Sequence, residues 1–183
     1  MLARMHQLAL SAIGRDRPGI VAATTAVLLR HGVNVEDSRM SILRGHFTMV
    51  LILGVSEETD RAALGADLDA VAADLGLEAL ALSAVEPLAE ATPEPTHVVA
   101  VYGVDHPGIV HRATAVLAEH GVNITDLETR LAEEQGEPSL YALLIEVALP
   151  PDLDPATLAA ALGEAAASES VEVSLRELDR HEL

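Results

Sequence analysis

The sequence predicts an α+β fold of two βαββαβ units in tandem, each a four-stranded antiparallel sheet with its helices on one face. Two observations carry this expectation. The segment "GRDRPGIVAATTAVLLRHGVNVED", residues 14–37, returns as "GVDHPGIVHRATAVLAEHGVNITD", residues 103–126, with 15 of its 24 positions identical. After each copy, apolar runs typical of strands and runs with helical spacing follow in the same order.

The repeat also predicts the domain organisation. Its offset of 89 residues is the size of a domain, which indicates a tandem duplication rather than a solenoid. Three prolines and several acidic residues interrupt the apolar pattern in "EPLAEATPEPTH", residues 86–97, and mark the joint. We therefore expect one domain over residues 1–91 and a second over residues 92–183.

The first two elements of each unit are a strand and a helix. In the first copy the apolar run "HQLALSAI", residues 6–13, suits a buried strand, and "GIVAATTAVLLRH", residues 19–31, has apolar side chains at helical spacing. The helix should end at Gly32, as its counterpart should at Gly121, because a glycine there can adopt the left-handed C′ conformation. The valine that follows each glycine can then pack back on the helix.

Two strands, a helix and a last strand complete each unit. The expected ranges are 35–43, 47–55, 60–76 and 77–85 in the first copy, and 124–131, 139–147, 154–168 and 171–178 in the second. Between the paired strands, "RGH" predicts a tight hairpin turn, whereas the second copy has the longer and acidic "AEEQGEP". The order is that of the ferredoxin-like fold, and right-handed crossovers place both helices on one face of the sheet.

The other face of each sheet suggests self-association. The strand segments "TMVLILGV" and "YALLIEV" are apolar on both sides, although a strand with one face in water should alternate. The sister unit or another chain should cover that face or its edges, so we expect a homo-oligomer.

Composition excludes several classes of function. The net charge of −18 would repel a phosphate backbone, so direct nucleic-acid binding is not expected. The chain has no cysteine, which excludes disulfides and thiolate metal sites. No uncharged stretch approaches the ~20 residues that cross a bilayer, and the first residues make a poor signal peptide. We expect a cytoplasmic protein that does not bind membranes.

The repeated segment carries a family resemblance. Asp-x-Pro-Gly-Ile-Val at a strand-to-helix turn and His-Gly-Val-Asn after the helix, in a βαββαβ unit, resemble the ACT domain, a small regulatory module that senses amino acids. Two such units with no catalytic domain resemble the family of the glycine cleavage system transcriptional repressor. The resemblance covers residues 8–86 and 98–178. It implies a non-enzymatic regulator that binds a small amino acid, glycine or serine, and signals to a protein partner, with a transcription factor as one candidate.

The strand-to-helix turn has chemistry that suits an α-amino acid. With Pro18 at the first helical position, the amides of Gly19 and Ile20 have no intrahelical acceptor and can bind a carboxylate. Asp16, just outside the helix, can bind an ammonium group.

Asn34 offers a donor and an acceptor at the start of the next strand, and the ACT resemblance places it near the ligand at an interface between units. The candidate ligand-binding residues are Asp16, Arg17, Pro18, Gly19, Ile20 and Asn34 in the first copy, and Asp105, His106, Pro107, Gly108, Ile109 and Asn123 in the second.

A purely structural interpretation of the same residues is also open. Asp16 can be an N-cap that accepts a hydrogen bond from a helix amide, Pro-Gly can be turn chemistry alone, and Asn34 can simply tolerate a left-handed backbone. The chain would then be a dimerisation or scaffold module without a ligand. A regulatory subunit of an enzyme of amino-acid metabolism is a further alternative.

The two copies differ at positions that matter to such a site. Arg17 is replaced by His106 and Ala22 by His111, so the second pocket should respond to pH where the first cannot. Arg39, which could pair with an acidic ligand group, is replaced by Glu128. We expect the two sites not to be equivalent.

No motif predicts a metal, a cofactor or an enzyme. His106 and His111 are five residues apart, which places them poorly on one helix face, and there is no His-Glu-x-x-His pattern. The acidic pairs 57–58 and 133–134 are expected to be solvated loop residues. RNA-recognition modules share the element order, but they stack bases on aromatics of two central strands, and the first strand here has none.

Overall fold

The structure is a computed structural model, and it describes residues 6–86, 93–132, 139–167 and 169–178. The chain divides into two compact units, Met1–Glu90 and Ala91–Leu183. The domain boundary expected between residues 91 and 92 lies outside the described residues, as do most of the acidic "AEEQGEP" segment and the acidic pair 133–134.

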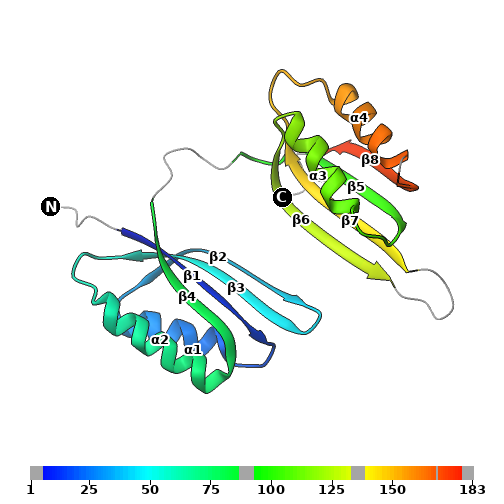
Figure 1. Cartoon of the computed structure of the whole chain (residues 1–183). Coiled ribbons are helices and arrows are strands. Elements are labelled where there is room, and N and C mark those ends of the chain that lie inside the picture. The colour runs from blue at the N-terminus through cyan, green and yellow to red at the C-terminus, as the bar shows by residue number, and fades with distance from the viewer. Residues whose placement is uncertain (1–5, 87–92, 133–138, 168, 179–183) are drawn as a thin grey trace. The chain divides into compact units, whose positions relative to one another are not determined.

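Each unit has the expected βαββαβ order (Figure 1). The first unit contains β1 (His6–Arg15), α1 (Ile20–Arg30), β2 (Asn34–Leu43), β3 (His46–Val55), α2 (Arg61–Leu75) and β4 (Leu77–Val85). The second contains β5 (His97–Val104), α3 (Ile109–Glu119), β6 (Asn123–Ala132), β7 (Leu140–Ala148), α4 (Pro155–Ala167) and β8 (Val171–Glu177).

The predicted fold class is confirmed. The strands lie in the order β2-β3-β1-β4 in one sheet and β6-β7-β5-β8 in the other, and all neighbouring strands are antiparallel. Figure 1 shows α1 and α2 together on one side of the first sheet, and α3 and α4 together on one side of the second. Both units are therefore ferredoxin-like.

The core of each unit lies between its sheet and its two helices. Alternate residues of β1 are buried, beginning with Leu8 and Leu10, and the register pairs Leu10 with Leu51 of β3, which is also buried. The core is mainly aliphatic, with Phe47 and Met49 of β3 buried among the aliphatic side chains. The buried residues alternate along the strand and face the helices, as the two-residue period of a strand requires.

The predicted end of the first helix is confirmed in both units. Gly32 has a φ of 64°, the N–H of Val33 donates to the carbonyl of Leu28 at 2.9 Å, and the N–H of Gly32 donates to Leu29 at 3.1 Å. This is the Schellman arrangement. Gly121 has a φ of 67° and closes α3 in the same way.

The predicted start of the first helix is wrong in both units. Pro18 does not occupy the first helical position: α1 begins at Ile20, and Gly19 is its N-cap, with a φ of 101°. In the second unit α3 begins at Ile109, and Gly108 has a φ of 110°. The left-handed turn that directs the helix back onto the sheet is open to glycine and closed to proline, whose φ is fixed near −65°. The proline is therefore displaced to the position before the cap.

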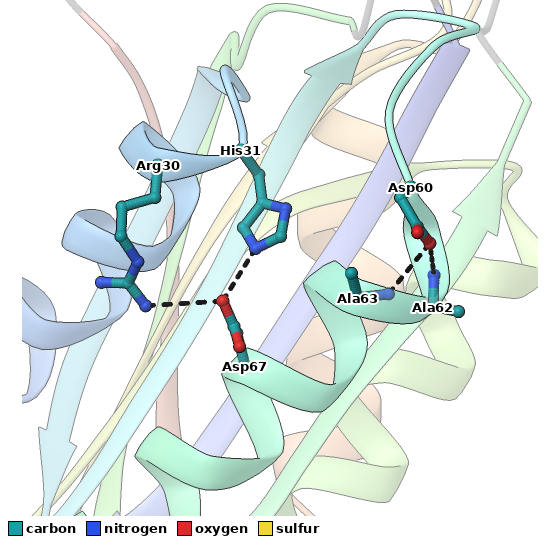
Figure 2. A network of polar contacts seen from close by, with 6 residues as sticks. All are labelled: Arg30, His31, Asp60, Ala62, Ala63 and Asp67. Carbon is teal, nitrogen blue, oxygen red and sulfur yellow. Dashed lines mark hydrogen bonds and ion pairs between the residues drawn. The ribbon is translucent and has the colours of Figure 1, made fainter.

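The second helix of each unit has a side-chain cap. The carboxylate of Asp60 accepts from the N–H groups of Ala62 and Ala63, both at 3.0 Å (Figure 2), and Asp154 accepts from Ala156 at 3.0 Å. Gly19, by contrast, makes no side-chain cap bond, so among the described residues of the first unit a side chain caps α2 and none caps α1.

An ionic contact joins the two helices of the first unit (Figure 2). Asp67 of α2 lies 2.9 Å from Nε2 of His31 and 3.6 Å from Nη2 of Arg30, both at the end of α1. The hydrogen bond from His31 lowers the pKa of Asp67 against the opposing effect of desolvation, and the charges of His31 and Arg30 act in the same direction as the bond. His31 is the C-cap residue of α1.

Turns with positive φ fix the hairpins and helix ends. Arg44 and Gly45, with φ of 50° and 83°, form the two-residue turn between β2 and β3, which confirms the tight hairpin predicted from "RGH". After the second helix, Gly76 has a φ of 62°, and the second unit places Ser170 at the equivalent point with a φ of 57°.

The outer face of each sheet keeps apolar side chains at the surface of its own unit. Val50 of β3 and Tyr102 of β5 are 49% and 50% exposed. The homo-oligomer inferred from this face stays a prediction. Separately, no helix among the described residues is long and apolar enough to span a bilayer.

We expect Thr24→Val to raise the stability of the first unit. Thr24 of α1 is fully buried, and its hydroxyl has no hydrogen-bond partner within the described residues. An unsatisfied buried hydroxyl costs about 1–3 kcal/mol, so an isosteric valine should stabilise the unit by about 1 kcal/mol, or about 4–8 °C in melting temperature. Differential scanning calorimetry measures the shift. Thr25→Val is the control, because Thr25 already donates to Val21 at 2.8 Å; an equal gain there would contradict this assignment.

We expect Gly19→Ala to destabilise the first unit by about 1–2 kcal/mol, because an L-residue is strained in the left-handed region. No atom would obstruct a Cβ at this position, so the effect isolates the backbone strain. Gly163→Ala is the matched control: this helical glycine is equally free of obstruction and should gain about 0.5–1 kcal/mol. Urea unfolding followed by circular dichroism measures both. A neutral Gly19→Ala variant would show that the left-handed turn is not required.

Candidate functional site

The candidate site begins with the turn between the first strand and the first helix of each unit: the first turn is residues 16–19, and the second turn is residues 105–108. The N–H of Asp16 donates to the carbonyl of Gly45 at 3.0 Å, which fixes the first turn to the β2–β3 hairpin. The N–H of Asp105 donates in the same way to Ser139 at 3.0 Å.

The carboxylate of Asp16 is not a helix cap. The cap residue is Gly19, no side chain caps α1, and the exposed Asp16 side chain has no hydrogen-bond partner within the described part of the chain. The capping interpretation of this residue is therefore wrong, because two residues separate Asp16 from the cap position. Asp105 stands in the same relation to Gly108 in the second turn.

Both first helices begin with amides that the chain does not satisfy. In α1 the N–H of Ala23 donates to the carbonyl of Gly19 at 2.9 Å, and the three residues between them have no acceptor for their N–H groups among the described residues. In α3 the corresponding bond joins Arg112 to Gly108 at 2.9 Å. Free amides at the positive end of a helix dipole are receptors for an anion such as a carboxylate. The free amides are present although each helix starts later than the sequence predicted.

The side chain of Arg17 makes a hydrogen bond within its own unit. Its Nη2 donates to the carbonyl of Asp74 at 2.8 Å, at the last turn of α2. The guanidinium lies at the negative end of the α2 dipole, which favours a cation. Arg17 therefore connects the first turn to the second helix, and its role in a site is to hold the turn.

His106 makes the same connection in the second unit with a group that titrates. Its Nε2 lies 3.0 Å from the carbonyl of Glu169 and its Nδ1 lies 3.1 Å from the carbonyl of Pro107. A carbonyl only accepts, so both contacts are hydrogen bonds only when both ring nitrogens carry a proton. The bonds to Pro107 and Glu169 raise the pKa of His106 against desolvation, and the negative charges of Glu169 and Asp105 add to the effect.

Glu169 joins His106 to α3. Its side chain is only 13% exposed, its Oε2 lies 3.4 Å from Nδ1 of His106, and its Oε1 pairs with Nε of Arg112. A cavity of about 20 Å³ beside Arg112 and Glu169 is large enough for about one water molecule. Counted from the register of the last strands, the first unit has Leu75 in place of Glu169. This cluster is therefore specific to the second unit.

A shallow hollow lies next to the second turn. It encloses about 410 Å³ and is lined by Gly108, by His111, Arg112 and Glu119 of α3, and by the end of α4. His111 and Arg112 lie near the free amides at the start of α3, whereas Glu119 is the last residue of the helix. The first unit has Ala22 and Ala23 where the second has His111 and Arg112.

Asn34 and Asn123 do not lie at these turns. Asn34 opens β2 and is opposite Gly54, which is also opposite Gln7 at the start of β1, whereas Asp16 follows the end of β1. Nine strand residues at ~3.3 Å each separate the two levels by about 30 Å. Asn123 lies at the corresponding end of the second sheet, opposite Ala148. Within one unit the structure therefore brings together the four turn residues and the first helical residue, without the asparagine.

Sequence reasoning missed the groups that hold the turns. Glu169 is 63 residues from His106, and neither Asp74 nor Gly45 contributes more than a backbone carbonyl. The one signal in the sequence for this cluster was that the second copy has His106 and Arg112 where the first has Arg17 and Ala23. For metals, the described residues contain no group of three or more His, Asp or Glu side chains arranged to hold an ion. Glu57 and Glu58 are exposed in the turn after β3.

We expect the stability of the second unit to depend on pH through His106. Because the folded pKa is raised above 6.5, the stabilisation is fully present below pH 6.5 and is lost as the pH rises through the raised value. The melting temperature of the second unit should therefore fall as the pH rises above 6.5 in the parent chain, and His106→Arg should remove that slope because arginine stays protonated. Calorimetry across this range measures it.

His106→Gln is the companion variant: it should lower the melting temperature at low pH to the value that the parent reaches at high pH. Equal slopes in the parent and in both variants would contradict the assignment of the titration to His106.

Comparison with known proteins places this geometry in a family. The ACT domain family matches residues 6–80 and again residues 97–161. The glycine cleavage system transcriptional repressor of Escherichia coli is 31% identical over 146 residues, which covers 74% of this chain and 70% of that protein. A UPF0237 protein of Methanosarcina mazei is 39% identical over 70 residues, covering 38% of this chain and 76% of that protein. The crystal structure of an unknown protein from Galdieria sulphuraria is 28% identical, covers 96% of this chain and 100% of its own, and has a TM-score of 0.78.

Proposed function

The chain belongs to the ACT domain family, with two ACT domains in tandem, and we propose that it is a non-enzymatic regulatory protein that binds a small amino acid at the first and second turns. The observation that carries the proposal is the same in both units: a helix whose first amides have no acceptor within the described chain begins beside an exposed aspartate. The family membership and the name of the Escherichia coli relative support a regulatory role.

The chemistry of the turn matches the two charged groups of an α-amino acid. The ligand carboxylate would accept hydrogen bonds from the amides at the start of α1 or α3. The ammonium group would pair with Asp16 or Asp105. Gly19 and Gly108 carry no side chain, and a Cβ built on either meets no atom within 4 Å, so the approach to the amides is open.

Glycine and serine are the first ligands to test. The named relative is a regulator of glycine cleavage, and the ACT resemblance suggests serine as a second small ligand. Signalling would pass to a protein partner, for which a transcription factor is a candidate. A chain with a net charge of −18 is not expected to bind nucleic acid itself.

The second turn is the better candidate of the two. It has the adjacent hollow of about 410 Å³, lined by His111 and by Arg112, whose Nε pairs with Glu169. His106 and Glu169 hold the turn to the end of α4. Asn34 and Asn123 lie about 30 Å from the turns of their own units, so either would contact a ligand only from a neighbouring ACT unit packed in the opposite direction.

We expect glycine or serine to raise the melting temperature of the chain in a thermal-shift panel of the twenty amino acids. A ligand that binds only the folded form stabilises it by about 2.7 kcal/mol at a hundredfold excess over Kd. Isothermal titration calorimetry on each hit then gives the stoichiometry, one site for each competent turn. A panel in which no amino acid shifts the melting temperature would overturn the proposal and leave a dimerisation or scaffold module.

Variants assign the site to a turn. Asp105→Asn should abolish the shift if the second turn binds, and Asp16→Asn should abolish it if the first turn binds, because each removes the charge that pairs with the ammonium group. Asp152→Asn, at an exposed turn before α4, is the matched control and should leave the shift unchanged. A shift that survives both turn substitutions in one chain would place the ligand elsewhere.

A further inference from the structure

We propose that the groove between α2 and the free edge of β4 is the docking surface for a second copy of this chain, which binds across a two-fold axis. The groove encloses about 360 Å³, and all the residues that line it belong to the first unit. Its wall is α2, with Arg61, Gly65 and Asp69, and its floor includes Leu80 and Leu82 of β4. The inference is independent of any ligand at the turns.

The wall of the groove is self-complementary in charge. Arg61 and Asp69 lie four residues before and four residues after Gly65, so the three side-chain positions form one stripe along α2. A two-fold axis at Gly65 sets α2 antiparallel to the α2 of the second copy and places each Arg61 opposite the partner's Asp69. Neither Arg61 nor Asp69 has a hydrogen-bond or ion-pair partner within the described residues, and both are exposed.

Gly65 permits the close approach that this packing needs. It is part-buried, and a Cβ at this position would meet no atom within 4 Å, so the surface is hollow at the midpoint of the stripe. The glycine is otherwise unfavourable, because glycine inside a helix costs about 0.5–1 kcal/mol relative to alanine. The second unit, aligned by its last strand, has Pro155, Ala159 and Gly163 at the three positions of the stripe. It therefore lacks both charges.

The floor of the groove is self-complementary in size. The residues of β4 that line it are Leu80, Leu82 and Ala84. Antiparallel pairing of β4 with its copy about Leu82 would set Leu80 opposite the partner's Ala84, a large side chain against a small one, on both sides of the axis. The centre of the strand and the centre of the helix stripe thus fall in the same groove, and one axis can satisfy both.

β4 is the edge of its sheet that is open to pairing. Edge strands of soluble proteins are commonly protected by charged residues, prolines or bulges. The other edge of the first unit, β2, has a bulge at Glu36 and carries Asp37 and Arg39. β4 has no proline, and its one charged residue and its register shift fall together at Glu78, before the segment Leu80–Ala84 that would pair. Backbone pairing along β4 would join the two sheets.

Charge also selects this surface over the rest of the molecule. Two chains of net charge −18 repel each other at most points of contact. The groove carries one Arg and one Asp, so it is locally neutral. In the symmetric complex it gains two Arg–Asp ion pairs. The occupant that this pattern fits is an identical surface, because each charge finds its opposite only in an antiparallel copy of the same stripe.

Sedimentation equilibrium on the full chain tests the proposal with a charge reversal and its rescue. The parent should form an assembly with an even multiple of the 19.2 kDa chain mass. Asp69→Arg and Arg61→Asp should each halve that mass, because each sets like charges opposite one another. The double variant Arg61→Asp with Asp69→Arg restores opposite charges and should recover the parent mass.

The control is Glu164→Arg on α4, an exposed acid-to-arginine change of the same size in the second unit, which should keep the parent mass. Circular dichroism shows that each variant is folded. A monomeric parent, as when another part of the same chain fills the groove, would overturn the proposal. Single variants that keep the parent mass, or a folded double variant that does not recover it, would overturn it equally.

Discussion

The left-handed glycine between the first strand and the first helix determines most of what each unit can do. Gly19 and Gly108 have φ near 100°, and the next residues, Ile20 and Ile109, enter the core directly. The same turn leaves the first helix amides without an acceptor in the described chain. Core packing and the free amides at the start of the helix are thus two results of one backbone conformation.

The two units reach similar backbones with different chemistry around that turn. A permanent cation, Arg17, connects the first turn to the end of α2, whereas an imidazole, His106, makes the connection to α4 and is itself held by Glu169. A guanidinium keeps its protons over the whole physiological range, and an imidazole does not. Duplication has therefore given one chain a turn that is indifferent to pH and a turn that is not, with the second also facing a hollow that contains Arg112.

The sequence predicted the fold well because its signals are local and occur twice. The element order, the glycine that ends each first helix and the β2–β3 turn all follow from residues next to each other in the chain. The helix start was placed wrongly because the preference of Pro18 for the first helical position is a local tendency, and the direction of the helix is set by the sheet on which it packs. Glu169 was missed because its contact with His106 spans 63 residues, and the separation of Asn34 from its turn follows from strand register, which spacing alone does not give.

The residue before the last strand adopts the same left-handed conformation in both units. After the second helix the first unit uses Gly76, with a φ of 62°, and the second unit uses Ser170, with a φ of 57°. Glycine adopts that conformation easily, whereas serine adopts it at a cost of order 1 kcal/mol. The backbone conformation is therefore the same in both units although the residue is not. The two units therefore allow a glycine and a serine to be compared in the same backbone conformation within one polypeptide, under the same solvent and temperature.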